Sequence, residues 1–411
     1  MTCRHCGSPL VQKVLDLGSA PPSNAYLTAR NLRGPEIGYP LVLRVCHSCW
    51  LVQTEDYAAA DQLFDAHYAY FSSTSTSWVE HAARYCRGII DRLGLTRASQ
   101  VVEVASNDGY LLRNFVAAGI PCLGIEPTDS TAEAAEAIGI PVLREFFTEA
   151  LGKRLASGGQ QADLIVGNNV FAHVPAINDF TLGIRAALKP AGTVTLEFPH
   201  LMRMFEQNQF DTVYHEHFSY FTLHTVRRIF AAAGLRVWDV EELPTHGGSL
   251  RVYGCHAADP RPESPLVERL LAEETRRGLQ SPAGYEGFQA KANRIKDDLL
   301  CFLIEQKRAG RTVAAYGAAA KGNTLLNYAG VKPDLLPFVC DAAPSKQGKW
   351  MPGSHIPILP PSVLAERRPD FLLILPWNIA TEVRQQNAAL ERQGTRFVTA
   401  IPELRVFPPL A

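Results

Sequence analysis

The sequence predicts an α/β protein in which a small cysteine-bearing module precedes two doubly wound halves. Three observations lead to this prediction. Four of the nine cysteines lie within the first 50 residues, short apolar runs alternate with helical periodicity from residue 78 onward, and this alternation resumes after a proline-rich stretch at 258–265. Short apolar strands that alternate with helices are typical of a parallel sheet covered on both faces.

Length and composition restrict the classes of protein to consider. The 411 residues predict two or three domains. The 40 Lys and Arg residues nearly balance the 41 Asp and Glu residues, so the net charge of −1 supplies no attraction to nucleic acid or to an anionic membrane. The longest apolar runs, such as 371–375, are far shorter than the ~20 residues that cross a bilayer. The odd number of cysteines and the polar start, Met-Thr-Cys-Arg-His-Cys, favour a cytoplasmic enzyme without a disulfide framework, which we expect to be a monomer.

The first doubly wound half is expected to begin with a helix over 78–93, capped by Ser77, because its apolar residues repeat at i, i+3 and i+4. A second helix is predicted over 225–233. The strands of this half are predicted at 101–104, 122–125, 164–166 and 194–198. Two later β-rich runs, 235–240 and 250–255, are expected to pair as an antiparallel hairpin at the sheet edge.

The second half follows two predicted helices, over 266–278 and 286–309. Its strands are predicted at 313–316, 336–340, 371–375 and 397–401. We therefore expect three domains: a module at 1–70, a central domain at 71–258 and a C-terminal α/β domain at 259–411.

Two Cys-x-x-Cys pairs about forty residues apart predict a metal site in the module. The four cysteines are Cys3, Cys6, Cys46 and Cys49. Two such pairs complete a tetrahedron of thiolates and leave no open coordination position, so we expect a structural zinc ion, with His5 and His47 not needed as ligands. Zinc ribbons often bind nucleic acid, but this module lacks clustered Lys and Arg residues with interleaved aromatics, which argues against that role.

Residues 101–110 read as a strand, a turn of small residues and the start of a helix. The turn lacks the Gly-x-Gly-x-x-Gly pattern and offers no obvious cradle for a pyrophosphate. An acidic residue on the strand, followed by Asp-Gly in the turn, suits S-adenosylmethionine, which has an amino-acid moiety and a ribose but no phosphate. The candidate residues for binding it are Glu103, Ala105, Ser106, Asn107, Asp108 and Gly109.

Two later strand ends complete the expected adenosylmethionine site. Glu126, followed by Pro127, ends the second strand, where a carboxylate can accept two hydrogen bonds from a ribose diol. Asn168 and Asn169 end a later strand, in the methyl-donor region of such folds. A nicotinamide-dependent dehydrogenase is the main alternative, and the missing glycine pattern counts against it.

A histidine-rich segment, Val-Tyr-His-Glu-His-Phe-Ser-Tyr at 213–220, combines groups that suit proton abstraction. Histidine can remove a proton near neutral pH, tyrosine can donate to a developing oxyanion, and glutamate can orient an imidazole. A metal site and a polar surface loop remain alternatives, although the His-Glu-x-x-His spacing of zinc proteases is absent. The segment follows the strand at 194–198, and ligands bind at the carboxyl ends of such strands.

The run Tyr-Gly-Ala-Ala-Ala-Lys-Gly-Asn at 316–323 predicts a second loop of small residues between a strand and a helix. Its amides could hold a nucleotide diphosphate, with Lys321 neutralising the charge; a tight turn with a solvated lysine is the alternative. The candidate substrate-binding residues are Tyr316, Lys321, Asn323 and Asp341, and Trp377 and Asn378 are further candidates at the rim.

Taken together, these motifs resemble the sugar C-methyltransferases that make branched deoxysugars for antibiotics. The resemblance extends over nearly the whole chain: the four-cysteine module, Glu-Val-Ala-Ser-Asn-Asp-Gly at 103–109, Tyr-His-Glu-His-Phe-Ser-Tyr at 214–220, and the run at 316–323. It implies two Rossmann-like domains and methylation of carbon 3 of a dTDP-linked 4-keto-6-deoxy sugar through an enolate, or of carbon 5 in some members.

The resemblance also implies roles for individual residues. His217 is expected to be the general base, assisted by Tyr214 and Glu216, with Tyr68 and His173 as neighbours in the active site. Two other functions stay open: O- or N-methylation of a related nucleotide sugar, and a zinc-ribbon binding protein that is not an enzyme.

Overall fold

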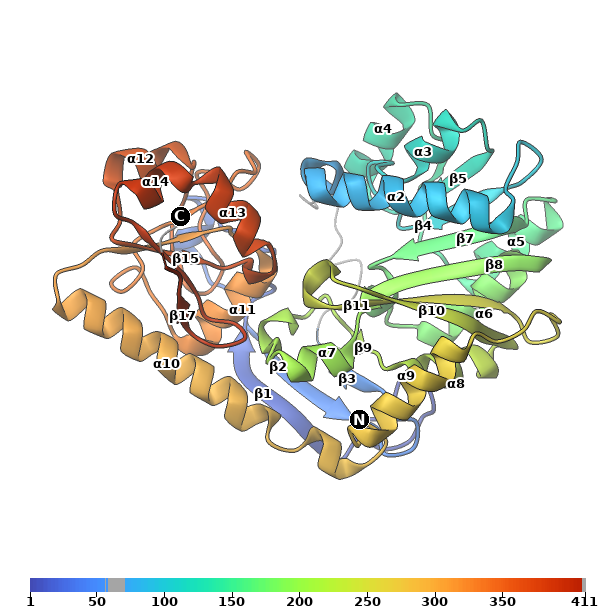
Figure 1. Cartoon of the computed structure of the whole chain (residues 1–411), viewed down its shortest axis with the longest axis horizontal. Helices are drawn as coiled ribbons and strands as arrows, with labels where there is room; N and C mark the ends of the chain where they lie inside the picture. Colours follow the sequence, from blue (N-terminus) through green and yellow to red (C-terminus); the bar gives the residue numbers. More distant parts are fainter. Residues whose placement is uncertain (56, 58–70, 409–411) are drawn as a thin grey trace.

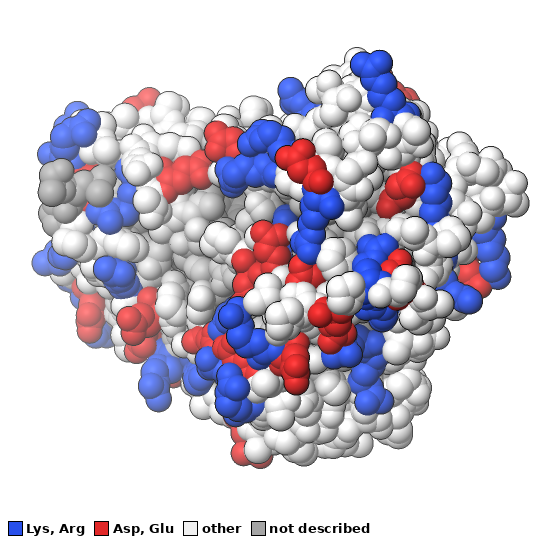
Figure 2. Space-filling view, turned by 45° about the vertical axis from the view of Figure 1, so that its right-hand side comes forward, with Lys and Arg blue, Asp and Glu red and all other residues white. Residues whose placement is uncertain are grey.

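The computed structural model describes residues 1–55, 57 and 71–408, which form three β-sheets with surrounding helices (Figure 1). In Figure 1 the C-terminal sheet lies on the left, the central sheet on the right, and the N-terminal strands between them at the bottom. Within the described residues, no helix is both long enough and apolar enough to cross a membrane. Lys and Arg residues are intermixed with Asp and Glu residues on the face shown in Figure 2, as expected from the balanced composition.

The N-terminal sheet is antiparallel and has the strand order β1-β2-β3-β9. Its strands are β1 (Gln12–Ala20), β2 (Tyr39–Val45), β3 (Val52–Thr54) and β9 (Ser219–Tyr220), and a 3-10 helix η1 (Asn31–Arg33) follows β1. No strand was predicted in this module from the sequence, because irregular pairing of β1 with β2 between Lys13 and Ser19 interrupts the alternation typical of a strand. Tyr220 of β9 pairs with Val52, which joins the histidine-rich segment to the module.

The central sheet has the order β10-β11-β8-β7-β4-β5-β6. Its strands are β4 (Val101–Val104), β5 (Cys122–Ile125), β6 (Val142–Leu143), β7 (Ala162–Asn168), β8 (Leu188–Pro199), β10 (Leu235–Leu243) and β11 (Ser249–His256). The predicted limits of the first two strands are confirmed. The predicted hairpin is also confirmed: β10 pairs antiparallel with β11, and β11 pairs antiparallel with β8 at that edge.

Helices α2 (Thr76–Leu93), α3 (Leu112–Ala117), α4 (Asp129–Ala137), α5 (Glu149–Ser157), α6 (Ile177–Ala187), α7 (Leu201–Glu206) and α8 (Leu223–Ala232) accompany this sheet. Short 3-10 helices are η2 (Ser72–Thr74), η3 (Phe171–His173), η4 (Phe210–Thr212) and η5 (Thr245–Gly247). The predicted cap of the first helix was wrong: Ser75, not Ser77, accepts the amide of Trp78, because a capping side chain bonds to an amide two or three residues ahead.

The C-terminal sheet has the order β14-β13-β12-β15-β16-β17. Its strands are β12 (Val313–Tyr316), β13 (Val339–Cys340), β14 (Ile358–Leu359), β15 (Phe371–Ile374), β16 (Arg396–Thr399) and β17 (Arg405–Val406). Helix α9 (Pro265–Arg276) packs against β10 and α8 of the central part. The helices that follow it are η6 (Pro282–Tyr285), α10 (Phe288–Arg308), α11 (Ala320–Ala329), α12 (Ser362–Arg367), η7 (Trp377–Ile379), α13 (Ala380–Gln386) and α14 (Ala388–Arg392). β13 is shorter than predicted because Pro337, inside the expected strand, has no amide to donate to a neighbour.

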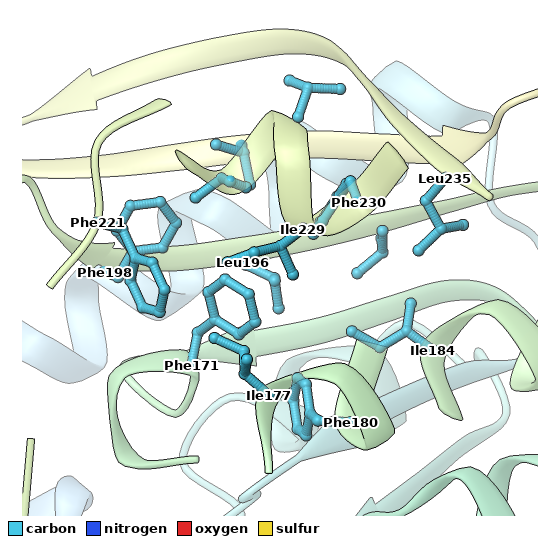
Figure 3. Packing of buried hydrophobic residues seen from close by; sticks show 14 of the residues in the cluster. Phe171, Ile177, Phe180, Ile184, Leu196, Phe198, Phe221, Ile229, Phe230 and Leu235 are labelled. Carbon is cyan, nitrogen blue, oxygen red and sulfur yellow. The ribbon is translucent and has the colours of Figure 1, made fainter. Parts of the chain in front are cut away.

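Two hydrophobic clusters join the parts of the chain. One contains Cys3, Cys46 and Cys49 together with the core between the central sheet and its helices. In that core, the rings of Phe171 and Phe221 stack at 4.4 Å between centroids, at the ends of the segments that carry the predicted active-site histidines (Figure 3). The second cluster joins β1 and β2 of the module to α10 and the C-terminal sheet.

In the central sheet and in the C-terminal sheet, the strand order reverses at the strand that comes first in the sequence. β4 lies between β5 and β7, and β12 lies between β13 and β15. Ligands of open α/β sheets bind at such switch points, beyond the carboxyl ends of the strands. The loops after β4 and after β12 are therefore the expected ligand-binding positions.

Candidate active site

The four cysteines of the module converge on one point. Their sulfur atoms all lie within 4.8 Å of one another, and the Cys3–Cys49 and Cys6–Cys46 sulfur pairs are each 3.5 Å apart. Four thiolates bound to zinc at about 2.3 Å lie about 3.8 Å apart, so the donor set fits a tetrahedral zinc ion. The two histidines inside the pairs bind elsewhere: His5 contacts the side chain of Asn178 and His47 that of Gln12. The site is closed, and the zinc ion is structural.

The loop after β4 is held by the carboxylate of Glu126. One oxygen of Glu126 accepts the amide of Asn107 at 2.9 Å, and the other accepts the amide of Thr128 at 3.0 Å. Asn107 has a positive φ of 50°, so the loop turns sharply at this point. Glu126 therefore braces the turn, in addition to any contact that its remaining lone pairs make with a ribose. Pro127 follows it at the tip of β5.

Several buried polar atoms at this sheet edge have no hydrogen-bond partner among the described residues. They are Glu103 Oε2, Ser106 Oγ, Asp108 Oδ1, both amide atoms of Asn168, and Asn169 Oδ1. Buried polar groups are normally paired, so this group of atoms marks the place of a polar ligand. Burial, with the nearby charges of Glu126 and Asp108, raises the pKa of Glu103 well above its usual range. A ligand that carries positive charge, as S-adenosylmethionine does, fits these acidic surroundings.

The loop after β12 is also held by a carboxylate that accepts two backbone amides. Asp341, which follows β13, accepts the amide of Ala318 at 2.7 Å and the amide of Ala343 at 2.8 Å. Its carboxylate also lies 3.6 Å from the ammonium of Lys346. Tyr316, at the end of β12, packs in the C-terminal hydrophobic core with Phe338 and neighbouring residues.

His217 and His173 lie together at the end of the central sheet. Their ring centroids are 4.6 Å apart, with the rings edge to face. Nδ1 of His217 lies 3.0 Å from the carbonyl oxygen of Thr212, and Nδ1 of His173 lies 2.8 Å from that of Glu216. Since a carbonyl only accepts, each Nδ1 carries the proton, and Nε2 of the neutral ring carries the lone pair.

Both imidazoles are uncharged at neutral pH. Burial lowers the pKa of His217 well below its usual range, and His173 lowers it further. Burial likewise lowers the pKa of His173 to about 4. A neutral imidazole whose Nε2 carries the lone pair can act as a base toward a substrate bound next to it.

The other residues of the histidine-rich segment divide between two faces. The ring of Tyr214 lies 4.0 Å from that of His217, beside the base. His215 faces the module instead, with Nε2 3.2 Å from the carbonyl oxygen of Tyr39. We expected a glutamate side chain to orient an imidazole, but in the described contacts backbone carbonyls orient both rings. The buried carboxylate of Glu216 binds Asn24 instead. Burial raises the pKa of Glu216 to about 7.

Helix α11 brings the C-terminal domain against this segment. The hydroxyl of Thr324 donates to the carbonyl oxygen of Val213 at 2.8 Å, and Asn323 is buried with its amide bonded to the carbonyl of Ser23 in the module. Lys321 donates to Asn378 Oδ1 at 2.8 Å and lies 4.9 Å from the centroid of the Trp377 ring. The site is thus formed by all three parts of the chain.

Three residues of the site were missed by sequence reasoning. Asn24 contacts Glu216, as described above; Asp211 is buried and accepts the indole N–H of Trp377 at 2.8 Å. His246, with a positive φ of 55°, lies 3.0 Å from the amide nitrogen of Asn169 through Nε2. Only the Thr-His-Gly-Gly run at 245–248 could have drawn attention to His246, since paired glycines allow an unusual turn. Isolated Asn and Asp residues give no such signal.

The structure therefore gathers most of the predicted residues in two adjoining groups. One surrounds the loop after β4, and the other contains Tyr214, Glu216, His217, His173 and Lys321. Asn169 and His246 join the two groups. Tyr68, which was expected here, lies outside the described residues.

Comparisons with known proteins show the family to which this chain is related. Family models match the chain as a zinc binding domain over residues 3–64, a methyltransferase domain over 78–240 and a C-methyltransferase C-terminal domain over 244–402. The C-methyltransferase NovU of Streptomyces niveus is 36% identical over 404 residues, which cover 98% of this chain and 96% of that relative.

Among solved structures, glycopeptide N-methyltransferase MtfA complexed with S-adenosyl-L-methionine shares 13% identity with this chain. The match has a TM-score of 0.34 and covers 43% of this chain and 94% of the MtfA chain. Magnesium protoporphyrin IX methyltransferase (ChlM) from Synechocystis PCC 6803 with bound SAM shares 12% identity and a TM-score of 0.33, covering 44% of this chain and 81% of its own.

Proposed function

This chain belongs to the C-methyltransferase family, and from that membership we propose that it methylates carbon 3 of a dTDP-linked 4-keto-6-deoxy sugar through an enolate. The chain is an S-adenosylmethionine-dependent methyltransferase with a zinc-binding domain. The nucleotide sugar, the carbon that is methylated and the roles of individual residues belong to the proposal.

The observation that carries the proposal is the state of His217. Its Nδ1–H donates to the carbonyl oxygen of Thr212, so Nε2 carries the lone pair and can act as the base within a buried site. A C-methyltransferase must first generate a nucleophilic carbon, and removing a proton next to a carbonyl is the simplest way to do so. O-methylation also needs a base, but the family match names C-methylation.

In the proposed reaction, Nε2 of His217 takes the proton from carbon 3, and the electron pair of that C–H bond moves toward the 4-keto oxygen. The enolate carbon then forms a bond to the methyl group, and the carbonyl is restored. S-adenosylmethionine supplies this methyl group as an electrophile and leaves as S-adenosylhomocysteine. Tyr214 lies beside the base, and the backbone carbonyl of Glu216 holds Nδ1 of His173. We propose that the buried carboxylate of Glu216 assists the reaction in its ionised form, which Asn24 stabilises.

We propose that the donor occupies the loop after β4, held by the unpaired polar atoms there. Glu103, Ser106, Asp108, Asn168 and Asn169 carry those atoms, and Ala105, Asn107, Gly109, Glu126 and Pro127 shape the turn around them. The nucleotide sugar is placed between this region and the loop after β12, with Asn323 and Asp341 at its C-terminal border. We place domain boundaries at 1–70, 71–258 and 259–411, because β11 pairs with β8 and so belongs to the central sheet.

One incubation tests the substrate and the carbon. The protein, with S-adenosylmethionine, is given a panel of dTDP-4-keto-6-deoxy sugars with either an amino or a hydroxyl group at carbon 3. Mass spectrometry should show a gain of one methylene mass, and NMR should place the new methyl on carbon 3. A methyl on carbon 5, on oxygen or on nitrogen would overturn the assignment to carbon 3, and the absence of methylation of every member would overturn the sugar class.

A further inference from the structure

Lys321 lies on the helix of the C-terminal domain that contacts the histidine-rich segment. It is in the first turn of α11, the helix whose Thr324 bonds to Val213 in the histidine-rich segment. Its ammonium contacts Asn378 and the face of Trp377, and the Trp377 indole in turn donates to Asp211, next to Thr212. Thr212 is the residue that orients His217. A short chain of contacts therefore connects Lys321 to the base.

The charge of Lys321 also acts on two imidazoles of the site. It contributes to lowering the pKa of both His217 and His246, after the larger effect of burial, so its field reaches the two imidazoles. Burial lowers the pKa of Lys321 itself, and the charge of Asp211 opposes this. The hydrogen-bond acceptor found for the ammonium within the described residues is the neutral amide of Asn378. An ammonium has three N–H groups, so two remain for a ligand.

We propose that Lys321 donates a hydrogen bond to the 4-keto oxygen of the substrate and stabilises the enolate. This inference rests on the proposed function, and it replaces the expected role of Lys321 as a partner of the nucleotide diphosphate. The C–H bond of carbon 3 breaks, its proton goes to Nε2 of His217, and its electron pair forms the carbon–carbon double bond while the carbonyl π pair moves to the oxygen. Lys321 keeps its proton and is unchanged at the end.

Such an arrangement favours the transition state over the bound ketone. The negative charge on the oxygen grows as the proton leaves, so the attraction to a fixed ammonium is greatest at that point. Asn378 and the Trp377 ring hold the ammonium in place before the reaction starts, which avoids the cost of reorganising it.

The test compares Lys321→Met, Lys321→Arg and, as a matched control on the C-terminal domain, Lys307→Met. Lys307 is exposed and pairs with Asp334 at 3.0 Å on the surface. Two quantities are measured: the exchange of the proton at carbon 3 in deuterium oxide, at saturating dTDP-4-keto sugar with S-adenosylhomocysteine present, and the affinity for dTDP by calorimetry.

We expect Lys321→Met to slow exchange by about 10²–10³-fold, as loss of an oxyanion donor does, while dTDP affinity changes less than about threefold. Lys321→Arg should recover part of the rate, and Lys307→Met should match the unmodified protein. Exchange at the unmodified rate in Lys321→Met would overturn the proposal. A large loss of dTDP affinity with unchanged exchange at saturation would restore the diphosphate role and overturn it as well.

A second variant separates catalysis from charge balance. If Lys321 only neutralises the buried Asp211, adding Asp211→Asn to Lys321→Met should restore exchange. We expect the double variant to stay slow, and recovery would overturn the proposal. If the unmodified protein neither exchanges nor methylates any member of the sugar panel, the proposed function fails, and this inference fails with it.

Discussion

Asn24 donates its side-chain amide to both carboxylate oxygens of Glu216, at 2.8 Å each. The two residues belong to different parts of the chain: Asn24 follows β1 in the zinc-binding module, and Glu216 lies in the histidine-rich segment. The module therefore supplies a direct partner to a buried active-site carboxylate, in addition to binding zinc. Strand β9 fixes this contact, because it pairs the end of the same segment with β3.

Replacing Asn24 with alanine should move the pH dependence of turnover. Burial raises the pKa of Glu216 to about 7, and the hydrogen bonds from Asn24 oppose that rise by stabilising the ionised form. Without them the pKa rises further, so the carboxylate ionises only at higher pH. Losing a hydrogen bond to a charged group costs about 1.5–3 kcal/mol, which corresponds to about one to two pH units. We expect the acidic limb of kcat/KM to shift upward by about that amount, with the exposed Asn31→Ala as the control. A limb that stays in place or moves to lower pH would contradict this role of Asn24.

Loss of a zinc ligand should destabilise the module and the site together. Cys46 and Cys49 are fully buried in the cluster that also contains the core of the central domain. Binding of a structural metal contributes directly to folding, so Cys46→Ser should hold less than half an equivalent of zinc and unfold at a lower temperature. Cys301→Ser, at an exposed cysteine, is the matched control. Elemental analysis and thermal unfolding measure both effects, and a fully folded Cys46→Ser protein without zinc would show that the metal is dispensable.

Glu126→Ala should weaken binding of S-adenosylmethionine by about 1–3 kcal/mol, the usual cost of losing charged hydrogen bonds. There are two reasons for this expectation: Glu126 follows β5, where the sequence predicts a contact with the ribose, and its carboxylate holds the amide of Asn107 in the turn. Calorimetry with S-adenosylhomocysteine measures the loss, and Glu133→Ala, on the exposed face of α4, serves as the control. An unchanged affinity would remove Glu126 from the donor site without affecting the fold.

Gly247→Ala should reduce turnover because the added methyl group has no room. A Cβ atom at Gly247 would lie 2.3 Å from the ring of Trp377 and 2.7 Å from the amide nitrogen of Gln209. Displacing Trp377 would also move Lys321, and small misplacements of reacting groups can cost about 10²-fold in rate. Gly310→Ala is a sharp control: its φ of 69° carries a similar strain, but nothing lies within 4 Å of the added atom. Equal activity of the two variants would show that the contact with Trp377 is unimportant.

The alternation of strands and helices predicted both parallel sheets well, because buried parallel strands are short apolar runs whatever surrounds them. The strands Val101–Val104, Cys122–Ile125 and Val313–Tyr316 have the predicted limits. The N-terminal sheet could not be predicted in this way, because β9, its fourth strand, is two residues long and comes from a segment more than 160 residues later.

The residues of the candidate site also differ in how far the sequence predicts them. His217 and Glu126 stand out in the sequence, since each belongs to a run of chemically active residues or follows a recognisable strand. Asn24, Asp211 and His246 act through contacts that only the folded chain creates, with Glu216, Trp377 and Asn169 respectively. Glu126 also braces the turn after β4, through bonds to backbone amides that leave no trace in the sequence.

His217→Ala tests the proposed mechanism most directly. Positioned general bases typically contribute about 10²–10⁴-fold in rate, so turnover should fall by about that factor while both ligands still bind. Exchange of the substrate's carbon 3 proton in deuterium oxide should be lost as well, measured with S-adenosylhomocysteine present so that the donor site is filled. His215→Ala is the matched control two residues away, because its imidazole contacts Tyr39 on the other face of the segment, and it should keep the exchange rate. If His217→Ala exchanges at the unmodified rate, the base lies elsewhere, and His173, 4.6 Å away between ring centroids, is the group to change next.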